Sequence, residues 1–281
     1  MKTSIQSLLA PSFRLAWLLG TVLTPCACNA ASGNASPSPL TSSASAPANL
    51  VQASPVQATR LKTRDPSPAL ELPKGLPLGT PTELSMPHDR SLRVVHAGPN
   101  TSHAIVYLHG MCGNSKGADR WADLANAHGT LIVVRANVPC PDRPGYKWPQ
   151  DIGSMQIRID RALERVKKER AGFLDTETLT LFGYSQGAHR GEKLAKRSPH
   201  RYKRVVLGGP PTAPQAPGFL SFQQIAVLGG ELEDRTHMEE GFARLKEAGL
   251  STKFFLLPRA HHGDYGPEGR KVISDLFNWL Y

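Results

Sequence analysis

The sequence lacks several features that would place it in other classes of protein. It contains only four cysteines, no internal repeat, and no apolar run of the roughly 20 residues that a membrane-spanning helix needs. The histidine and cysteine spacings of common zinc sites, such as H-E-x-x-H and C-x-x-C, are also absent. These absences argue against a transmembrane anchor, a repeat array and a metalloenzyme, and we expect neither a metal nor an organic cofactor.

Acidic residues are missing from the first 60 positions, and the whole chain is basic, with 33 Lys and Arg against 23 Asp and Glu. The basic residues are scattered along the chain, and no aromatic residues alternate with them to stack on bases. We therefore interpret the charge as a solvated basic surface, with a specific anionic ligand as the alternative, and expect no nucleic-acid partner.

Residues 1–30 have the order of a secretory signal peptide. Lys2 and Arg14 flank a mostly uncharged stretch, a short apolar run follows at 15–23, and small residues lead up to Ala30. The sequence therefore predicts export from a bacterial cell. The mature protein is expected in the periplasm, in the medium or on a membrane.

Two cysteines leave the processing of this segment open. The residues before Cys26 and Cys28 resemble the lipobox of bacterial lipoproteins, although Pro25 departs from the usual pattern at both. Lipid attachment through one of these cysteines, or ordinary cleavage after Ala30, are the two alternatives.

Residues 31–75 are dominated by Ala, Ser, Pro, Thr and Gln and show no periodic apolar face. Such a composition buries too little apolar surface to offset the entropy of ordering, which predicts a disordered linker. The folded domain is expected over 76–281, as a monomer.

Within this domain, short β-branched apolar runs alternate with segments of helical periodicity. The predicted strands are 104–108, 131–134, 178–182, 204–207, 225–228 and 254–257, and helical spacing recurs at 159–166, 242–248 and 272–279. Residues 83–86 and 92–95 could add an antiparallel hairpin. The alternation predicts an α/β fold, with a mostly parallel central sheet covered by helices on both faces.

One strand runs directly into Gly183-Tyr-Ser185-Gln-Gly187, a G-x-S-x-G motif followed by a predicted helix. In this context the serine occupies a tight, strained turn, and the two glycines let strand and helix backbones approach closely. The motif predicts that Ser185 is an exposed nucleophile.

A second motif, His109-Gly110-Met111, follows an earlier strand. In hydrolases with this kind of elbow, the loop at that place supplies one backbone N–H of the oxyanion hole, and the residue after the nucleophile supplies the other. Met111 and Gln186 are the expected donors, and His109 is interpreted as a structural residue that pins the loop.

Together the two motifs resemble the α/β-hydrolase superfamily, nearest to its small phospholipase/carboxylesterase and dienelactone-hydrolase branches. The resemblance covers roughly residues 104–281 and implies a serine esterase without a large lid domain. The Ser-Gln-Gly elbow is similar to that of the phospholipase/carboxylesterase branch, whereas dienelactone hydrolases carry cysteine at the position of Ser185.

The chain order of this superfamily implies an acid after strand 225–228 and a histidine after strand 254–257. Asp234 is our first choice for the acid, with Glu231 as the alternative. His262 is our first choice for the base, with His261 as the alternative.

Cys112 and Cys140 follow neighbouring strands, and an exported protein meets an oxidising compartment, so we expect them to form a disulfide. Tyr146 and Trp148 lie where members of the superfamily build part of the substrate pocket, and they are either substrate-binding residues or simply packing aromatics. No loop is long enough for a lid domain, which favours an open site for short or medium acyl esters.

The resulting hypothesis is an exported serine hydrolase that cleaves carboxylic esters, or thioesters, through an acyl-enzyme on Ser185. A small molecule or a polymer could carry the ester. A peptidase or amidase of the same fold, and a non-catalytic binding module displayed on the surface, are the alternatives.

Overall fold

The structure, a computed structural model, describes residues 71–281. The predicted signal peptide, both cysteines considered for lipid attachment and most of the predicted linker lie outside these residues. Within 71–281, no helix combines the length and the apolar composition that crossing a membrane would require.

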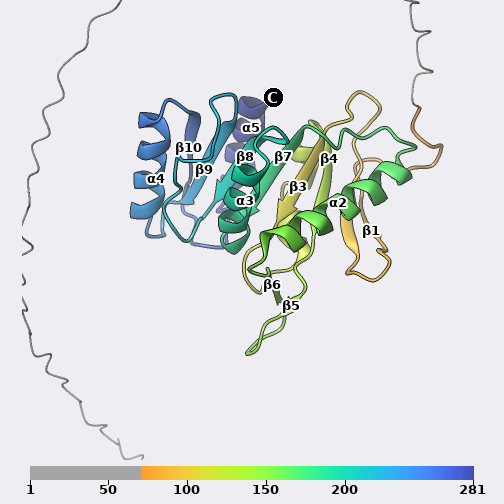
Figure 1. Cartoon of the computed structure of the whole chain (residues 1–281), viewed down its shortest axis with the longest axis horizontal. Helices are drawn as coiled ribbons and strands as arrows, with labels where there is room; N and C mark the ends of the chain where they lie inside the picture. The colour runs from red at the N-terminus through yellow and green to blue at the C-terminus, as the bar shows by residue number, and fades with distance from the viewer. Residues whose placement is uncertain (1–70) are drawn as a thin grey trace, which may run out of the picture. The chain divides into compact units, whose positions relative to one another are not determined.

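A single eight-stranded sheet forms the centre of the domain, in the order β1-β2-β4-β3-β7-β8-β9-β10 (Figure 1). Its strands are β1 (Pro81–Leu84), β2 (Leu92–Val95), β3 (Ala104–Leu108), β4 (Thr130–Val134), β7 (Leu179–Tyr184), β8 (Tyr202–Gly208), β9 (Gln224–Gly230) and β10 (Ser251–Leu257). The first two strands form the expected antiparallel hairpin, and β2 continues antiparallel to β4. All other pairs are parallel, which confirms the prediction of a mostly parallel sheet.

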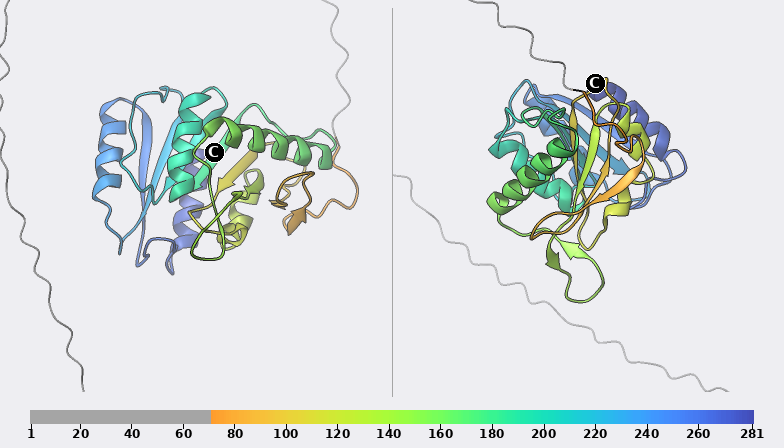
Figure 2. Two further views of the ribbon diagram at one scale, coloured as in Figure 1. Left: turned by 60° about the horizontal axis from the view of Figure 1, so that its bottom comes forward. Right: turned by 90° about the vertical axis from the view of Figure 1, so that its right-hand side faces the viewer.

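Helices cover both faces of this sheet, as the right-hand view of Figure 2 shows. They are the 3₁₀ helix η1 (Ser115–Ala118) and the α-helices α1 (Ala122–Asn126), α2 (Ile152–Glu169), α3 (Gln186–Arg197), α4 (Thr236–Glu247) and α5 (Gly269–Leu280). One core cluster joins the sheet to α2, α3 and α4, and a second joins it to α1 and α5. The central strand β3 contributes alternate residues to the two clusters, because successive side chains of a strand point to opposite faces.

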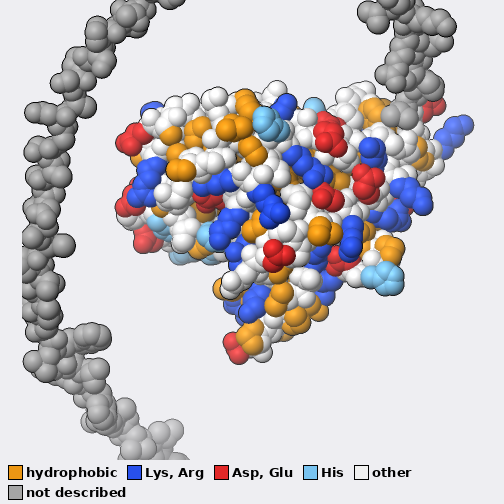
Figure 3. Space-filling model, in the orientation of Figure 1, with side chains coloured by type: hydrophobic (Ala, Val, Ile, Leu, Met, Phe, Trp, Pro, Cys, Tyr) orange, Lys and Arg blue, Asp and Glu red, His pale blue; other side chains and the backbone are white. Residues whose placement is uncertain are grey.

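The longest helix, α2, illustrates how the sequence specifies these elements. The Asp151 carboxylate accepts hydrogen bonds from the Gly153 and Ser154 N–H groups, which caps the first turn. Apolar residues then recur every three or four positions and are buried against the sheet, namely Met155, Ile159, Ala162, Leu163 and Val166. On the outer face in Figure 3, basic and acidic side chains lie interspersed over α2 and its surroundings.

Several small elements, including the 3₁₀ helix η1, were not predicted from the sequence. Residues 135–151 contain a short hairpin of β5 (Val138–Pro139) and β6 (Tyr146–Lys147), and the five-residue helix α1 covers one face of the sheet. All are too short to produce a clear periodic pattern. The predicted absence of a lid domain is confirmed, because neither this hairpin nor the helix-free segment 209–223 forms one.

The parallel strands end at one edge of the sheet, and the predicted functional residues follow directly from those ends. His109 follows β3, Ser185 follows β7, the acidic residues 231–234 follow β9, and His262 lies five residues after β10. Parallel strands bring these four segments together although they are far apart in the sequence.

Candidate active site

The strand-to-helix turn at Ser185 has the backbone conformation of a nucleophile elbow. Ser185 has φ 52° and ψ −119°, a positive φ that is uncommon for a residue with a side chain. Its N–H donates to the carbonyl of Gly208 at the end of β8, over 2.7 Å, which holds the turn in place.

The glycines on either side of the serine are explained by close backbone approaches. A Cβ on Gly183 would lie 2.3 Å from the carbonyl oxygen of Gly187, and a Cβ on Gly187 would lie 2.1 Å from the carbonyl oxygen of Leu108. Both separations are far shorter than van der Waals contact. Only glycine allows β3, β7 and α3 to meet at this point.

His262 lies between the serine and a carboxylate. Its Nε2 is 3.0 Å from Ser185 Oγ, and its Nδ1 is 2.6 Å from an oxygen of Glu233. The imidazole is about half exposed, whereas the Glu233 side chain is only 8% exposed. The arrangement has the order nucleophile, base and orienting acid of a catalytic triad.

The expectation that Asp234 contacts the histidine is wrong in this structure. Asp234 is exposed at the start of α4, where its carboxylate accepts from both the N–H and the hydroxyl of Thr236. Glu231, the alternative, is also exposed and accepts from the Arg259 N–H. The acid beside His262 is Glu233, which the sequence analysis did not select.

Glu233 reaches the histidine because of the turn after β9. One of its carboxylate oxygens accepts from the Gly230 N–H at 2.6 Å, which folds the side chain back over the turn and leaves the other oxygen for His262. Asp234 instead accepts from the N–H and the hydroxyl of Thr236 in an Asp-x-Thr turn that leads into α4, a common local role for aspartate. That pattern is the signal that could have excluded it.

The electrostatics of the pair match this geometry. The hydrogen bond that His262 donates to Glu233 raises the pKa of the imidazole above its usual 6.5, against the opposing effect of burial. For Glu233, burial alone would raise the pKa, but the hydrogen bonds from His262 and the Gly230 N–H outweigh it, and the pKa is lowered. Glu233 therefore stays ionised and holds the proton of the imidazole on Nδ1.

The position of His262 also depends on Tyr184, which precedes the nucleophile. The Tyr184 hydroxyl accepts a hydrogen bond from the Gly263 N–H at 2.8 Å, and its ring packs against the imidazole. His261, the alternative base, is exposed and contacts neither Ser185 nor Glu233 within the described residues. The structure thus brings His262, rather than His261, to the serine.

The two expected oxyanion donors are adjacent to the nucleophile. A Cβ on Gly110 would lie 3.2 Å from Ser185 Cβ, so the loop that carries Met111 packs directly on the elbow. Gln186 is the first residue of α3, where backbone N–H groups have no partner within the helix. Neither the Met111 nor the Gln186 N–H donates to another group in residues 71–281, and both are available to an oxyanion.

His109 pins this loop through both of its ring nitrogens, although its ring also borders the cavity beside Ser185. Its Nδ1 is 2.7 Å from the Gly110 carbonyl, and its Nε2 accepts from the Ala136 N–H at 3.0 Å. The second contact requires an unprotonated Nε2, and burial lowers the pKa of the ring, so the side chain is neutral with its proton on Nδ1. This agrees with the structural role expected for it.

Trp148 is not in the place expected of a substrate-binding residue. It is 2% exposed and does not line the cavity beside Ser185. Its indole N–H donates to the His109 carbonyl at 2.7 Å, and its backbone N–H donates to the Gln186 side chain at 2.9 Å. Trp148 therefore joins the segments that carry both oxyanion donors instead of contacting a substrate.

The expected disulfide joins Cys112 to Cys140. It ties the loop at residues 109–113, the predicted oxyanion loop, to the β5–β6 hairpin. A Cβ on Gly145 would lie 2.3 Å from the Cys112 carbonyl oxygen, so this glycine packs closely on the disulfide-linked loop.

Tyr146, like Trp148, lies outside the cavity beside Ser185. Its ring lies under the Arg90 guanidinium at 3.5 Å and lines a neighbouring hollow.

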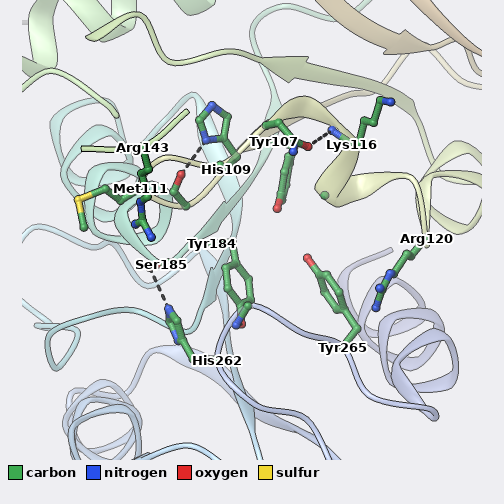
Figure 4. A pocket seen from close by; sticks show the side chains of 15 residues that line it. Tyr107, His109, Met111, Lys116, Arg120, Arg143, Tyr184, Ser185, His262 and Tyr265 are labelled. Carbon is green, nitrogen blue, oxygen red and sulfur yellow. Dashed lines mark hydrogen bonds between the residues drawn. The ribbon is translucent and has the colours of Figure 1, made fainter. Parts of the chain in front are cut away.

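A cavity of about 550 Å³ opens beside the nucleophile (Figure 4). Ser185 and His262 lie at one side of it, and Met111 lies at its rim. The phenol groups of Tyr107, Tyr184 and Tyr265 line it as well. The cavity is large enough for an ester with a short or medium acyl chain.

Comparisons with known proteins agree on the architecture. No protein-family model matches the sequence, and no curated protein is significantly similar to it. The domain is similar to a Bacillus cereus carboxylesterase, with 17% identity, 69% of this chain and 95% of that chain covered, and a TM-score of 0.55. It is also similar to esterase PE8, with 17% identity, 67% and 97% covered, and a TM-score of 0.52. An esterase from the fungus Rhizomucor miehei gives 16% identity, 72% and 82% covered, and a TM-score of 0.53.

At these identities the likeness concerns the fold. The similarity extends over most of each of the three other chains, so it covers the whole architecture rather than one motif. It confirms the fold that the two sequence motifs implied.

Proposed function

From the α/β-hydrolase fold that the chain shares with these esterases, we propose that it is a serine-dependent hydrolase of carboxylic esters. The observation that carries the proposal is the position of His262, within hydrogen-bond distance of both Ser185 Oγ and Glu233. Substrate choice is not fixed by a fold, so thioesters remain part of the proposed substrate class.

In the proposed mechanism His262 Nε2 accepts the Ser185 proton while Oγ attacks the acyl carbon. The Met111 and Gln186 N–H groups bind the oxyanion of the tetrahedral intermediate, and each such donor typically contributes about 2.7–4 kcal/mol in the transition state. The imidazolium then protonates the leaving alcohol. Water, deprotonated by the same histidine, attacks the acyl-enzyme and releases the acid and free serine.

Glu233 stabilises the imidazolium that forms in both halves of this cycle. Its negative charge lies 2.6 Å from Nδ1 and is largely shielded from water, so the interaction is weakly screened. Tyr184 supports the same step by holding the Gly263 N–H, next to the histidine.

The test is hydrolysis of a series of 4-nitrophenyl esters by the protein and by its Ser185→Ala variant. Activity that disappears in the variant while folding is retained supports the serine mechanism. Ester hydrolysis that survives in the variant contradicts it, and the same assay with matched amides distinguishes an esterase from an amidase.

We also propose that the chain is exported. The support is the Cys112–Cys140 disulfide, because such links persist in oxidising compartments. Fractionation of the producing cells tests this proposal. Accumulation of the full-length, uncleaved chain in the cytoplasm would contradict it, and mass analysis of the mature N-terminus distinguishes a lipid on Cys26 or Cys28 from cleavage after Ala30.

A further inference from the structure

The cavity beside Ser185 is lined by three cationic side chains and by no carboxylate. Lys116 and Arg120 come from η1 and the residues after it, and Arg143 comes from the connection between β5 and β6. Figure 4 shows all three around the same opening. Like charges repel, so their convergence on one cavity is unfavourable unless a negative charge joins them.

Elsewhere on the domain, several arginines are paired with carboxylates. Arg93 contacts Asp119, Arg135 contacts Glu83, and Arg201 contacts Asp160.

Within the cavity, a carboxylate partner is present for Arg120 alone. Its guanidinium lies 2.8 Å from Asp264, which belongs to the loop after His262. Neither Lys116 nor Arg143 forms an ion pair within residues 71–281. The Arg143 charge therefore faces the cavity without a carboxylate partner, whereas Lys116 borders the cavity with its ammonium directed outward in Figure 4.

Arg143 is held near the site by the disulfide. Its connection begins at Cys140, which is bonded to Cys112 of the oxyanion loop, and Gly145 at its other end packs on Cys112. The Cys140 N–H also donates to the Gly145 carbonyl at 3.1 Å, which closes the connection at its base. The cation is therefore carried by a restrained segment rather than by a free loop.

The inner wall of the cavity supplies hydroxyl groups. The rings of Tyr107 and Tyr265 are buried, and in Figure 4 their hydroxyls point toward the interior of the cavity. Tyr265 Oη is almost fully buried beside Tyr107, and by distance and angle it has no hydrogen-bond partner within the described residues. Because burial raises the pKa of both phenols, they stay neutral and can donate to an acceptor.

We propose that this cavity binds a negatively charged group, carboxylate or phosphate, that is part of the ester substrate. Lys116 and Arg143 attract the anion and orient the ester so that its carbonyl reaches Ser185. The proposal rests on the proposed ester hydrolysis and narrows its substrate class to anionic esters. It adds no chemical step, because water still cleaves the acyl–oxygen bond to give an acid and an alcohol.

The experiment compares kcat/KM for matched charged and neutral esters, using the full chain. The 4-nitrophenyl monoester of glutarate is compared with 4-nitrophenyl valerate, and the 4-nitrophenyl ester of 4-phosphonobutyrate tests a phosphate-like group. Butyrate esters of glycolic acid and of glycolamide form a second pair, in which the charge is on the alcohol. The variants are Lys116→Gln and Arg143→Gln, with Arg161→Gln, an exposed residue of α2 outside the cavity, as the matched control.

We expect a charged-to-neutral ratio above one in at least one pair. Each cavity variant should lower that ratio about threefold, as expected for one unit charge about 6 Å away in a water-like dielectric. The ratio should also fall as the salt concentration rises, because salt screens exposed charges, and Arg161→Gln should leave it unchanged. A ratio of one or less in all pairs, or equal ratios in the cavity variants and the control, would overturn the proposal.

A binding measurement separates this proposal from the proposed function. Calorimetric titration of monomethyl glutarate and of glycolate butyrate into the Ser185→Ala protein needs no turnover. Binding that weakens about threefold when Lys116→Gln or Arg143→Gln is added supports the anion site even if neutral esters are not hydrolysed. Binding of neither compound overturns it, even if Ser185 hydrolyses neutral esters.

Discussion

Replacing Glu233 by glutamine should nearly abolish turnover, although the new side chain has almost the same shape. The two carboxylate oxygens accept from two different N–H groups, those of Gly230 and of His262 Nδ1, each over 2.6 Å. Glutamine has only one oxygen, so its amide NH₂ must face one of these donors. Either the turn after β9 or the orientation of the imidazole is then lost.

The expected loss is large because the missing charge stabilises an imidazolium at a largely buried contact. Removal of the acid in other serine triads lowers kcat by roughly 10⁴-fold, about 5.5 kcal/mol in transition-state stabilisation. We expect Glu233→Gln to lower kcat about 10³–10⁴-fold, because water can still partly stabilise the imidazolium of the half-exposed His262.

The matched control is Asp234→Asn, which removes the same charge from the next residue. Asparagine keeps an oxygen for the Thr236 N–H and forms the same kind of local turn, so activity should change by less than about threefold. The assay is kcat/KM on 4-nitrophenyl butyrate, with thermal unfolding of both variants to verify folding. Equal losses in the two variants, or a nearly fully active Glu233→Gln, would refute the assignment of the acid.

Four further predictions concern pH, the elbow, the oxyanion loop and the disulfide. Glu233 raises the pKa of His262, and the base must be neutral to accept a proton, so kcat/KM should fall as the pH drops through a value above 6.5. Glu233→Gln should shift this acidic limb of the pH profile to lower pH. An acidic limb that the variant leaves unchanged would contradict the coupling of the two side chains. Gly187→Ala should unfold or inactivate the protein, whereas Gly191→Ala, whose Cβ meets nothing closer than 3.6 Å, should stabilise α3 by up to about 1 kcal/mol in chemical denaturation; similar effects of both would refute the close-approach argument. Trp148→Phe keeps an aromatic ring but removes the donor to the His109 carbonyl, and should cost about 1–3 kcal/mol of stability and lower kcat, whereas an unchanged kcat would show that the loop does not depend on this bond. Joint replacement of Cys112 and Cys140 by serine should lower the free energy of unfolding by about 2–4 kcal/mol, and free-thiol labelling of both cysteines in the untreated protein would argue against the disulfide.

The fold could be predicted because its signals are local and repeated. The six predicted parallel strands all occur within a few residues of their expected positions, since continuous apolar runs are typical of strands buried on both faces. The elbow could be predicted as well, because a close approach between backbones leaves glycine as the only choice at Gly183 and Gly187.

The acid could not be selected from the sequence because three carboxylates lie within four residues, at 231, 233 and 234. The choice depends on how the turn after Gly230 directs each side chain, which is a tertiary property. The sequence left the role of Trp148 open between substrate binding and packing for a similar reason. Its place in the chain is beside the pocket, but its indole is buried and bonded to the oxyanion loop.

The most direct test of the account is covalent labelling of the serine by a fluorophosphonate, followed by mass analysis of the peptides. The account predicts about one label per chain, on Ser185, with labelling strongly slowed in His262→Ala and Glu233→Gln but not in Asp234→Asn. Labelling at another residue, or labelling of Ser185 at an equal rate in all three variants, would contradict it.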